Sequence, residues 1–177
     1  RAYSAFLVGG MLRRAGCTIR PYETHIGETD RAIEEIHTDL VEAFEGRRPL
    51  YETVAEAFSR LDRIEVNREA RPKIAIFGDL YSRDNDVFNQ DLIHTIERAG
   101  GEVVTTPYSE YMKIVSAAYF KRWRHDGRIQ RLATYKTLLA LVELIERRMK
   151  RFMSPEITEI VFTPKTDPED ILRQFHI

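Results

Sequence analysis

Apolar side chains recur at helical spacing over most of the chain. Between positions 3 and 14 they fall at 3, 6, 7, 8, 11 and 12, close to the i, i+3, i+4 spacing of an amphipathic helix. Gly16 is the expected C-cap of this helix, and the segment 17–23 then resembles a short strand that enters a loop at Pro21.

A clearer helical stripe runs through 28–63. It predicts one helix that Thr29 caps and Gly46 ends, followed by a second helix over about 51–63. The stripe consists of Ile33, Ile36, Leu40 and Phe44 in the first helix and of Val54, Phe58 and Leu61 in the second.

The pattern changes at Pro72, where the continuous apolar run 74–77 is too short for a helix. Such runs are typical of strands covered on both faces of a parallel sheet. Helical spacing over about 86–99 and a second strand at "EVVTTP" complete a β-α-β unit over about 73–107. We therefore expect an α/β protein with a Rossmann-like or flavodoxin-like parallel sheet core and substantial additional helices.

The C-terminal third is expected to be mostly helical, with helices from Ser109 to Gly127 and over 128–152. The segment "ITEIVF" fits either a last strand or part of a turn. Asp167 and Pro168 predict the start of a final helix. The whole of 1–177 is interpreted as one α/β domain or lobe, with helical portions at 28–63 and 109–152.

Composition narrows the classes of partner. The 27 basic and 28 acidic residues nearly cancel, which gives no argument for binding nucleic acid or a membrane surface. No apolar run approaches the roughly 20 residues of a bilayer span. The single cysteine, Cys17, permits no disulfide within the chain, so a reducing cytoplasm is expected. The missing initial Met suggests a fragment of a longer protein.

Polar residues gather where the strand over 73–77 ends, and ligands bind at the carboxyl ends of strands in open α/β sheets. Gly78 would let the backbone turn, and the amides that open the expected 86–99 helix would attract an anion. The alternative is an ordinary turn in which Asp84 or Asp86 caps the helix. The candidate ligand-binding residues here are Gly78, Asp79, Tyr81, Arg83, Asp84, Asn85 and Asn89.

Two further groups of residues are candidates. Tyr108, Tyr111 and Lys113 follow the second strand and would lie on the same rim, either as ligand contacts or as half-buried packing residues. Arg20, Tyr22 and Glu23 offer a planar guanidinium beside a polar corner, or only a salt bridge next to a proline turn.

Other reactive residue types give little. The five histidines lack metal-ligand spacing. Cys17 fits a small buried apolar residue, and as a weak candidate metal ligand it would need partners from outside the chain. The aromatic and basic segment "YFKRWRHDGRIQR" is interpreted as a solvated helix face rather than an RNA-binding patch.

Taken together, the segments "GGMLRRAGCTIRPYE", "GETD" and "RPKIAIFGDLYSRDNDVFNQDLIHTIERAGGEVVTTPYSEYMK" resemble the large proteins related to 2-hydroxyacyl-CoA (2-hydroxyglutaryl-CoA) dehydratases and their activases. The resemblance implies an oxygen-sensitive iron–sulfur system of anaerobes, in which an ATP-hydrolysing activase passes one electron to a dehydratase acting on a CoA thioester. It implies that residues 78–89 and 108–113 face a cluster or substrate cleft, and that 20–23 form another recurrent segment.

The chain also departs from that family. It has one cysteine where dehydratase clusters need several, and it lacks the DxGS-type phosphate loop of an activase. The resemblance therefore implies that a [4Fe-4S] cluster and the catalytic parts belong to the parent protein outside this chain. This lobe is expected not to be catalytic in isolation.

Three functions are consistent with these residues. The first is a lobe that lines a cleft for a CoA thioester, a nucleotide or a cluster, together with the rest of the parent protein or a partner subunit. The second is an interaction module without a ligand of its own, which an exposed apolar patch on the 128–152 helix would favour. The third is a flavodoxin-like protein that binds a small anion.

Overall fold

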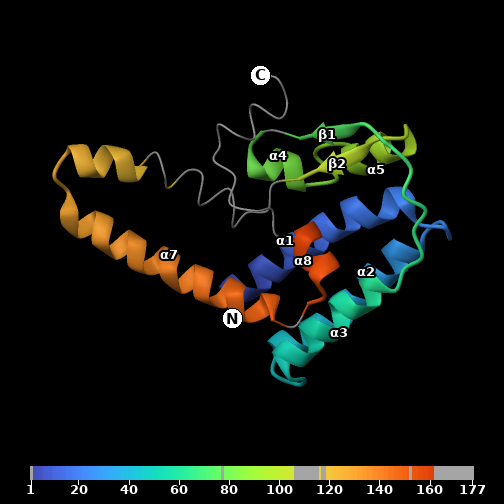
Figure 1. The fold of residues 1–177 in the computed structure, drawn as a ribbon, viewed down its shortest axis with the longest axis horizontal. Helices are drawn as coiled ribbons and strands as arrows, with labels where there is room; N and C mark the ends of the chain where they lie inside the picture. Colours follow the sequence, from blue (N-terminus) through green and yellow to red (C-terminus); the bar gives the residue numbers. More distant parts are fainter. Residues whose placement is uncertain (1, 77, 106–115, 117–118, 152, 162–177) are drawn as a thin grey trace.

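The computed structural model describes residues 2–76, 78–105, 116, 119–151 and 153–161 (Figure 1). This part of the chain is mostly helical and contains one two-stranded parallel sheet. The elements are α1 (Ala2–Ile19), a short 3-10 turn η1 (Arg20–Tyr22), α2 (Glu28–Phe44), α3 (Leu50–Asp62), β1 (Lys73–Ala75), α4 (Leu80–Asp84), α5 (Leu92–Arg98), β2 (Glu102–Val104), α7 (Ile129–Lys150) and α8 (Pro155–Val161).

Helix α1 is the centre of the larger core. Its buried face packs against α2, α3 and α8, so that side chains from both ends of the described chain share one apolar cluster. The most deeply buried large side chains of this cluster are Val8, Met11, Ile36, Val54, Phe58, Leu61, Met149 and Ile157.

The prediction that the first helix stops at Gly16 is wrong, as is the strand at 17–23. Helix α1 continues to Ile19, and η1 follows directly. Gly16 is buried inside the helix, where a Cβ would lie 2.9 Å from Cδ1 of Ile33 on α2. Its role is therefore close packing between two helices rather than capping. Extended pairing in this region is limited to one antiparallel bridge between Glu23 and Val66.

The two helices expected over 28–63 are confirmed as α2 and α3. Thr29 is not the cap of α2, because the helix begins at Glu28 after Gly27, whose φ of 83° is left-handed. The Thr29 side chain is fully buried, and its backbone N–H donates to the Glu23 carboxylate at 2.8 Å.

The parallel pairing of the two predicted strands is confirmed. Lys73, Ile74 and Ala75 of β1 pair with Glu102, Val103 and Val104 of β2, in that order. Burial on both faces of the first strand is not observed, since Ile74 is 39% exposed. The described residues contain only these two paired strands, so the α/β layer is smaller than the expected Rossmann-like core.

A second, smaller apolar cluster joins the sheet to α1. It contains Cys17 from α1, Ile76, Ile93 of α5 and Val103 of β2, with Ile96 packed against them. Gly101 allows this approach, because a Cβ there would lie 2.8 Å from Cδ1 of Ile74.

The helix predicted over 86–99 does not begin at 86. Instead α4 ends at Asp84, a turn occupies 86–91, and α5 begins at Leu92. Gln90 and Asp91 both have a left-handed φ of 57°. Asn and Asp side chains that bond to the nearby backbone compete with helix formation, and this segment contains five of them between 84 and 91.

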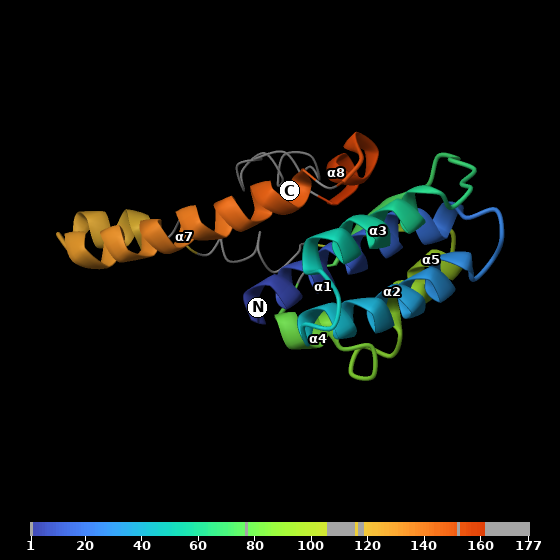
Figure 2. The same ribbon diagram turned by 90° about the horizontal axis from the view of Figure 1, so that it is seen from below.

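Residues 119–151 form a helical arm that extends away from the body (Figures 1 and 2). A helical stretch over 119–125 turns back at Gly127, whose φ is 67°, into α7. The ring centroids of Phe120, Trp123 and Tyr135 lie 5.5–6.3 Å apart and hold the two segments together near the tip. The expected long helix over 128–152 is thus confirmed as α7.

The last described element, α8, is a helix, which excludes the strand considered for "ITEIVF". The Ser154 hydroxyl caps it by accepting from the backbone N–H of Ile157 at 3.2 Å. The helix starts predicted at Ser109 and Asp167 lie outside the described residues. Among the described helices, none combines the length and apolarity of a bilayer span.

Replacing Phe58 tests the core built on α1. We expect Phe58→Ala to lower the free energy of unfolding by about 3–5 kcal/mol, because it removes a fully buried ring. The matched change Phe88→Ala, at a ring that is 63% exposed, should alter it by less than about 0.5 kcal/mol. Denaturant titration followed by circular dichroism measures both, and equal losses would contradict this placement of the core.

Candidate functional site

The segment that follows β1 is a tightly bonded turn. The Asp79 carboxylate accepts from the backbone N–H of Tyr81 at 2.9 Å and caps α4. The Asn85 side-chain oxygen accepts from the N–H of Phe88 at 2.9 Å. Gly78 has a left-handed φ of 142°, and open space surrounds its α-carbon. These residues therefore shape the backbone, as in the alternative reading of this motif.

Asn89 connects both ends of the same turn. Its amide nitrogen donates to the Arg83 carbonyl at 2.9 Å, and its amide oxygen accepts from the N–H of Leu92 at 3.2 Å. Arg83 is buried and lies beside Asp84, with 3.3 Å between Nε and Oδ1. The polar side chains of Asp79, Asn85 and Asn89 thus each bond to the local backbone.

Arg13 of α1 clamps this turn from the body. Its guanidinium donates to the Asp84 carbonyl at 2.9 Å and to the Asp86 carboxylate at 2.7 Å. A helix that began at 86 would have offered free amides to an anion, but α5 starts at Leu92 and is one turn shorter than expected of such a site. The predicted anion position at 86–89 is therefore wrong.

Tyr81 differs from its polar neighbours because its side chain is 65% exposed. Its ring packs edge-on against Phe88, with the centroids 5.8 Å apart. Val87, next to Phe88, is 92% exposed. The turn consequently displays apolar side chains to solvent while its polar side chains hold the backbone.

The second group of sequence candidates forms the best-buried ion pair among the described residues. Arg20 donates from Nε to the Asp30 carboxylate at 2.7 Å and from Nη1 to both Glu97 oxygens at 3.0 and 3.1 Å. The Arg20 side chain is 15% exposed and that of Glu97 is 5% exposed. Residues from η1, α2 and α5 are thereby tied together.

The charges of this ion pair shift each other's protonation. Burial alone would lower the pKa of Arg20, but Glu97 and Asp30 outweigh it and raise that pKa. Burial raises the pKa of Glu97, and Arg20 opposes that rise. Because both Glu97 oxygens accept from a guanidinium, the geometry fits an ionised carboxylate.

His94 and Asp91 extend the same group of charges to the surface. The hydrogen bond from the His94 ring lowers the pKa of the exposed Asp91, and Arg98 contributes in the same direction. The other ring nitrogen of His94 lies 3.9 Å from Asp30. These positions give α5 its charged side and offer no free nucleophile.

Tyr22 and Glu23, the remaining candidates of this group, are structural by their contacts. The Tyr22 hydroxyl donates to the buried Glu102 carboxylate at 2.7 Å, and burial together with this bond raises the Tyr22 pKa. The guanidiniums of Arg68 and Arg71 lie 5.3 and 5.5 Å from the Tyr22 ring centroid. The Glu23 carboxylate accepts from the backbone N–H groups at the start of α2.

Cys17 lies beneath these charges and is 1% exposed. Burial, with a smaller contribution from Glu97, raises its pKa to about 12. A metal or cluster ligand must be a thiolate, so a protonated, buried thiol does not fit that role. Within the described residues no group of three or more His, Cys, Asp or Glu side chains suits a metal ion. These residues therefore do not fit a [4Fe-4S] cluster.

The candidates Tyr108, Tyr111 and Lys113 lie outside the described residues. Other participants were missed by sequence reasoning, because their partners are far away along the chain: Asp30, Glu97 and Glu102 each bond to a residue of 20–22. Helical spacing marked 92–98 as amphipathic, but nothing local indicated which polar residue of α5 would be buried.

The most exposed apolar surface lies on the arm. Leu138, Leu141 and Leu144 of α7 are 52%, 52% and 57% exposed. Their spacing of three places them within about 120° of one side of the helix. We call these three residues the leucine face.

Comparison with known proteins adds no assignment. No family model matches the chain, and no curated protein and no solved structure matches it. The class that the described residues define is a mostly helical protein with a small parallel sheet, a buried ion pair and an apolar arm. Any function is therefore inferred from these surfaces.

Removing Arg20 tests the buried ion pair. We expect Arg20→Ala to lower the free energy of unfolding by about 3 kcal/mol, because Glu97 is left buried without its cation. Arg98→Ala is the control, since that side chain is 67% exposed and should change stability by less than about 1 kcal/mol. Chemical denaturation at neutral pH measures both, and a small loss for Arg20→Ala would show that the pair is dispensable.

Thiol chemistry tests the surroundings of Cys17. With a pKa of about 12 and 1% exposure, the native thiol should resist alkylation at pH 8 and react fully in denaturant. A pKa raised by folding means that stability is intact below the ordinary value of 9.0 and falls as pH rises towards about 12. Fast labelling of the native protein with a thiol reagent would contradict both statements.

Proposed function

We propose that this chain is a docking lobe, whose helical arm joins it to a neighbouring protein domain or subunit. The observation that carries the proposal is the leucine face, three large apolar side chains in one row that no described element covers. Monomeric proteins rarely expose such rows, which mark interaction surfaces.

The construction of the arm supports the same function. Helix α7 has 22 residues, and only its last part reaches the body, where Glu146 and Met149 are buried. There the Arg148 guanidinium lies 4.2 Å from the centroid of the Tyr51 ring on α3. An arm fixed at its root and exposed along its length adds little to the stability of its own fold, which favours a role in contact with another molecule.

The resemblance to dehydratase and activase proteins agrees with this proposal, because it places the lobe within a larger iron–sulfur assembly. A CoA thioester, a nucleotide and a [4Fe-4S] cluster remain proposals for the parent protein. The hydrogen bonds of Asp79, Asn85 and Asn89 to the local backbone favour docking over ligand binding for this chain.

Site-specific photo-cross-linking tests the docking function. A photoreactive amino acid is placed at Leu141, in cells that make the full protein, and at the exposed Lys136 about 140° around the same helix as a matched control. We expect one dominant protein adduct from position 141 and little from 136, with the adducted segment identified by mass spectrometry.

A third variant sharpens this measurement. Adding Leu138→Glu and Leu144→Glu should abolish the adduct at 141, because charge on the leucine face prevents its burial. Equal yields at 141 and 136, or a yield that survives both glutamates, would overturn the proposed function.

A further inference from the structure

The turn between α4 and α5 is a second exposed apolar surface. Tyr81, Val87 and Phe88 are 65%, 92% and 63% exposed, and Leu92 at the start of α5 is 36% exposed. We call these four residues the display patch. Outside the arm, it is the largest group of exposed apolar residues that lie close in sequence among the described residues.

The backbone beneath the display patch is held in an unfavourable conformation. Gln90 and Asp91 are both left-handed, at a cost of roughly 1–2 kcal/mol for each residue with a side chain. Asn85, Asn89 and Arg13 offset that cost through their bonds to this turn. The bonds fix the turn, yet its apolar side chains gain no burial within the fold.

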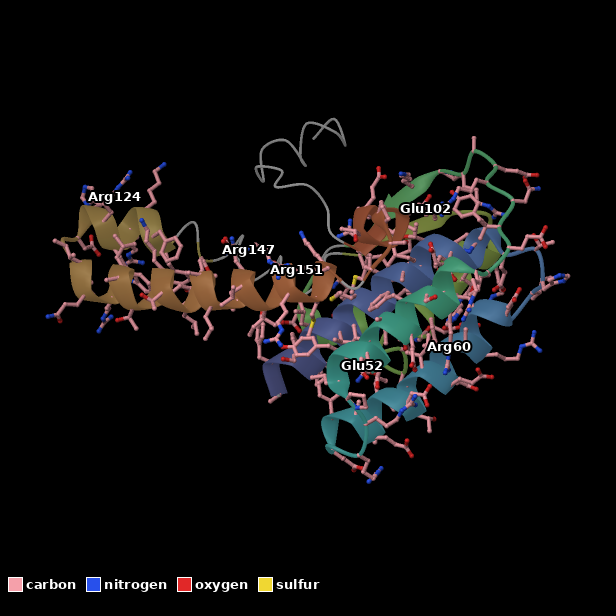
Figure 3. The ribbon with its side chains drawn as sticks, turned by 60° about the horizontal axis from the view of Figure 1, so that its bottom comes forward. Glu52, Arg60, Glu102, Arg124, Arg147 and Arg151 are labelled. Atoms are coloured by element: carbon pink, nitrogen blue, oxygen red, sulfur yellow. The ribbon has the colours of Figure 1, made fainter. Side chains whose placement is uncertain are left out.

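The charges around the two apolar surfaces are opposite. Between 79 and 91 the chain has four aspartates and one arginine, and that arginine is buried. The arm, 119–151, has ten Lys and Arg residues against three Asp and Glu. Figure 3 shows Arg124 near the tip of the arm and Arg147 and Arg151 nearer the body. The basic residues therefore flank the leucine face on both sides.

The two surfaces of one copy do not meet. The arm points away from α4 and α5 in both ribbon views (Figures 1 and 2). A contact between them must therefore form between two molecules, and two such contacts related by a twofold axis would close a dimer.

We propose that the leucine face of one copy docks on the display patch of a second copy, and that the basic arm and the acidic 79–91 segment steer and align the contact. This inference rests on the proposed docking function and names its partner. Apolar side chains supply the burial, while the opposite charges disfavour the arm-to-arm pairing that two basic arms would otherwise make.

Paired cysteine variants of the whole chain test this arrangement. Val87→Cys protein is mixed with Leu141→Cys protein under mild oxidation, while the native Cys17 stays inert because it is buried. We expect a disulfide between the two different variants, and much less of it when Lys136→Cys replaces Leu141→Cys. Dominant Leu141→Cys homodimers, or equal yields from the control, would overturn the inference.

Sedimentation velocity gives an independent measurement on the unmodified chain. We expect a dimer at micromolar concentration that dissociates as salt rises, and a dissociation constant roughly tenfold or more higher in the Val87→Glu, Phe88→Glu variant. Circular dichroism shows whether that variant is folded. A monomer at every concentration would overturn self-docking, whereas a selective adduct at Leu141 would still support docking on a different protein.

Discussion

The buried pairing of Arg20 with Glu97 is the interaction on which the arrangement of the body depends. Arg20 lies directly after α1, and its guanidinium reaches α2 through Asp30 and α5 through Glu97. It thereby joins the helical layer to the small sheet, which otherwise meet mainly through α1 and the apolar cluster around Cys17. Gly16 gives this side chain room, since a Cβ there would lie 3.1 Å from an Arg20 nitrogen.

The same interaction explains why part of the fold was predictable and part was not. The periodic stripes of α2, α3 and α7, and the two short strands, follow from local pattern and are confirmed. The end of α1 was misjudged because a helix-ending glycine and a packing glycine look alike in sequence. Only the position of Ile33 and Arg20 in space distinguishes the two roles.

The candidate site shows a similar limit. The motif at 78–89 was correctly placed after a parallel strand, but the roles of its polar residues depend on hydrogen bonds that spacing does not reveal. Asp79 and Asn89 bind backbone groups two to six residues away. Near-neutral total charge also concealed an uneven distribution, since the basic residues are concentrated in the arm and acidic residues dominate between 79 and 91. A sum over the chain removes the information that a surface carries.

The aromatic cluster at the tip of the arm has a spectroscopic consequence. Trp123 is the only tryptophan of the chain, and it lies with Phe120 and Tyr135 far from the core around α1. The indole emission of this protein therefore reports on the arm and not on the body. Melting of the core and detachment of the arm are thus optically separable events in one unlabelled molecule.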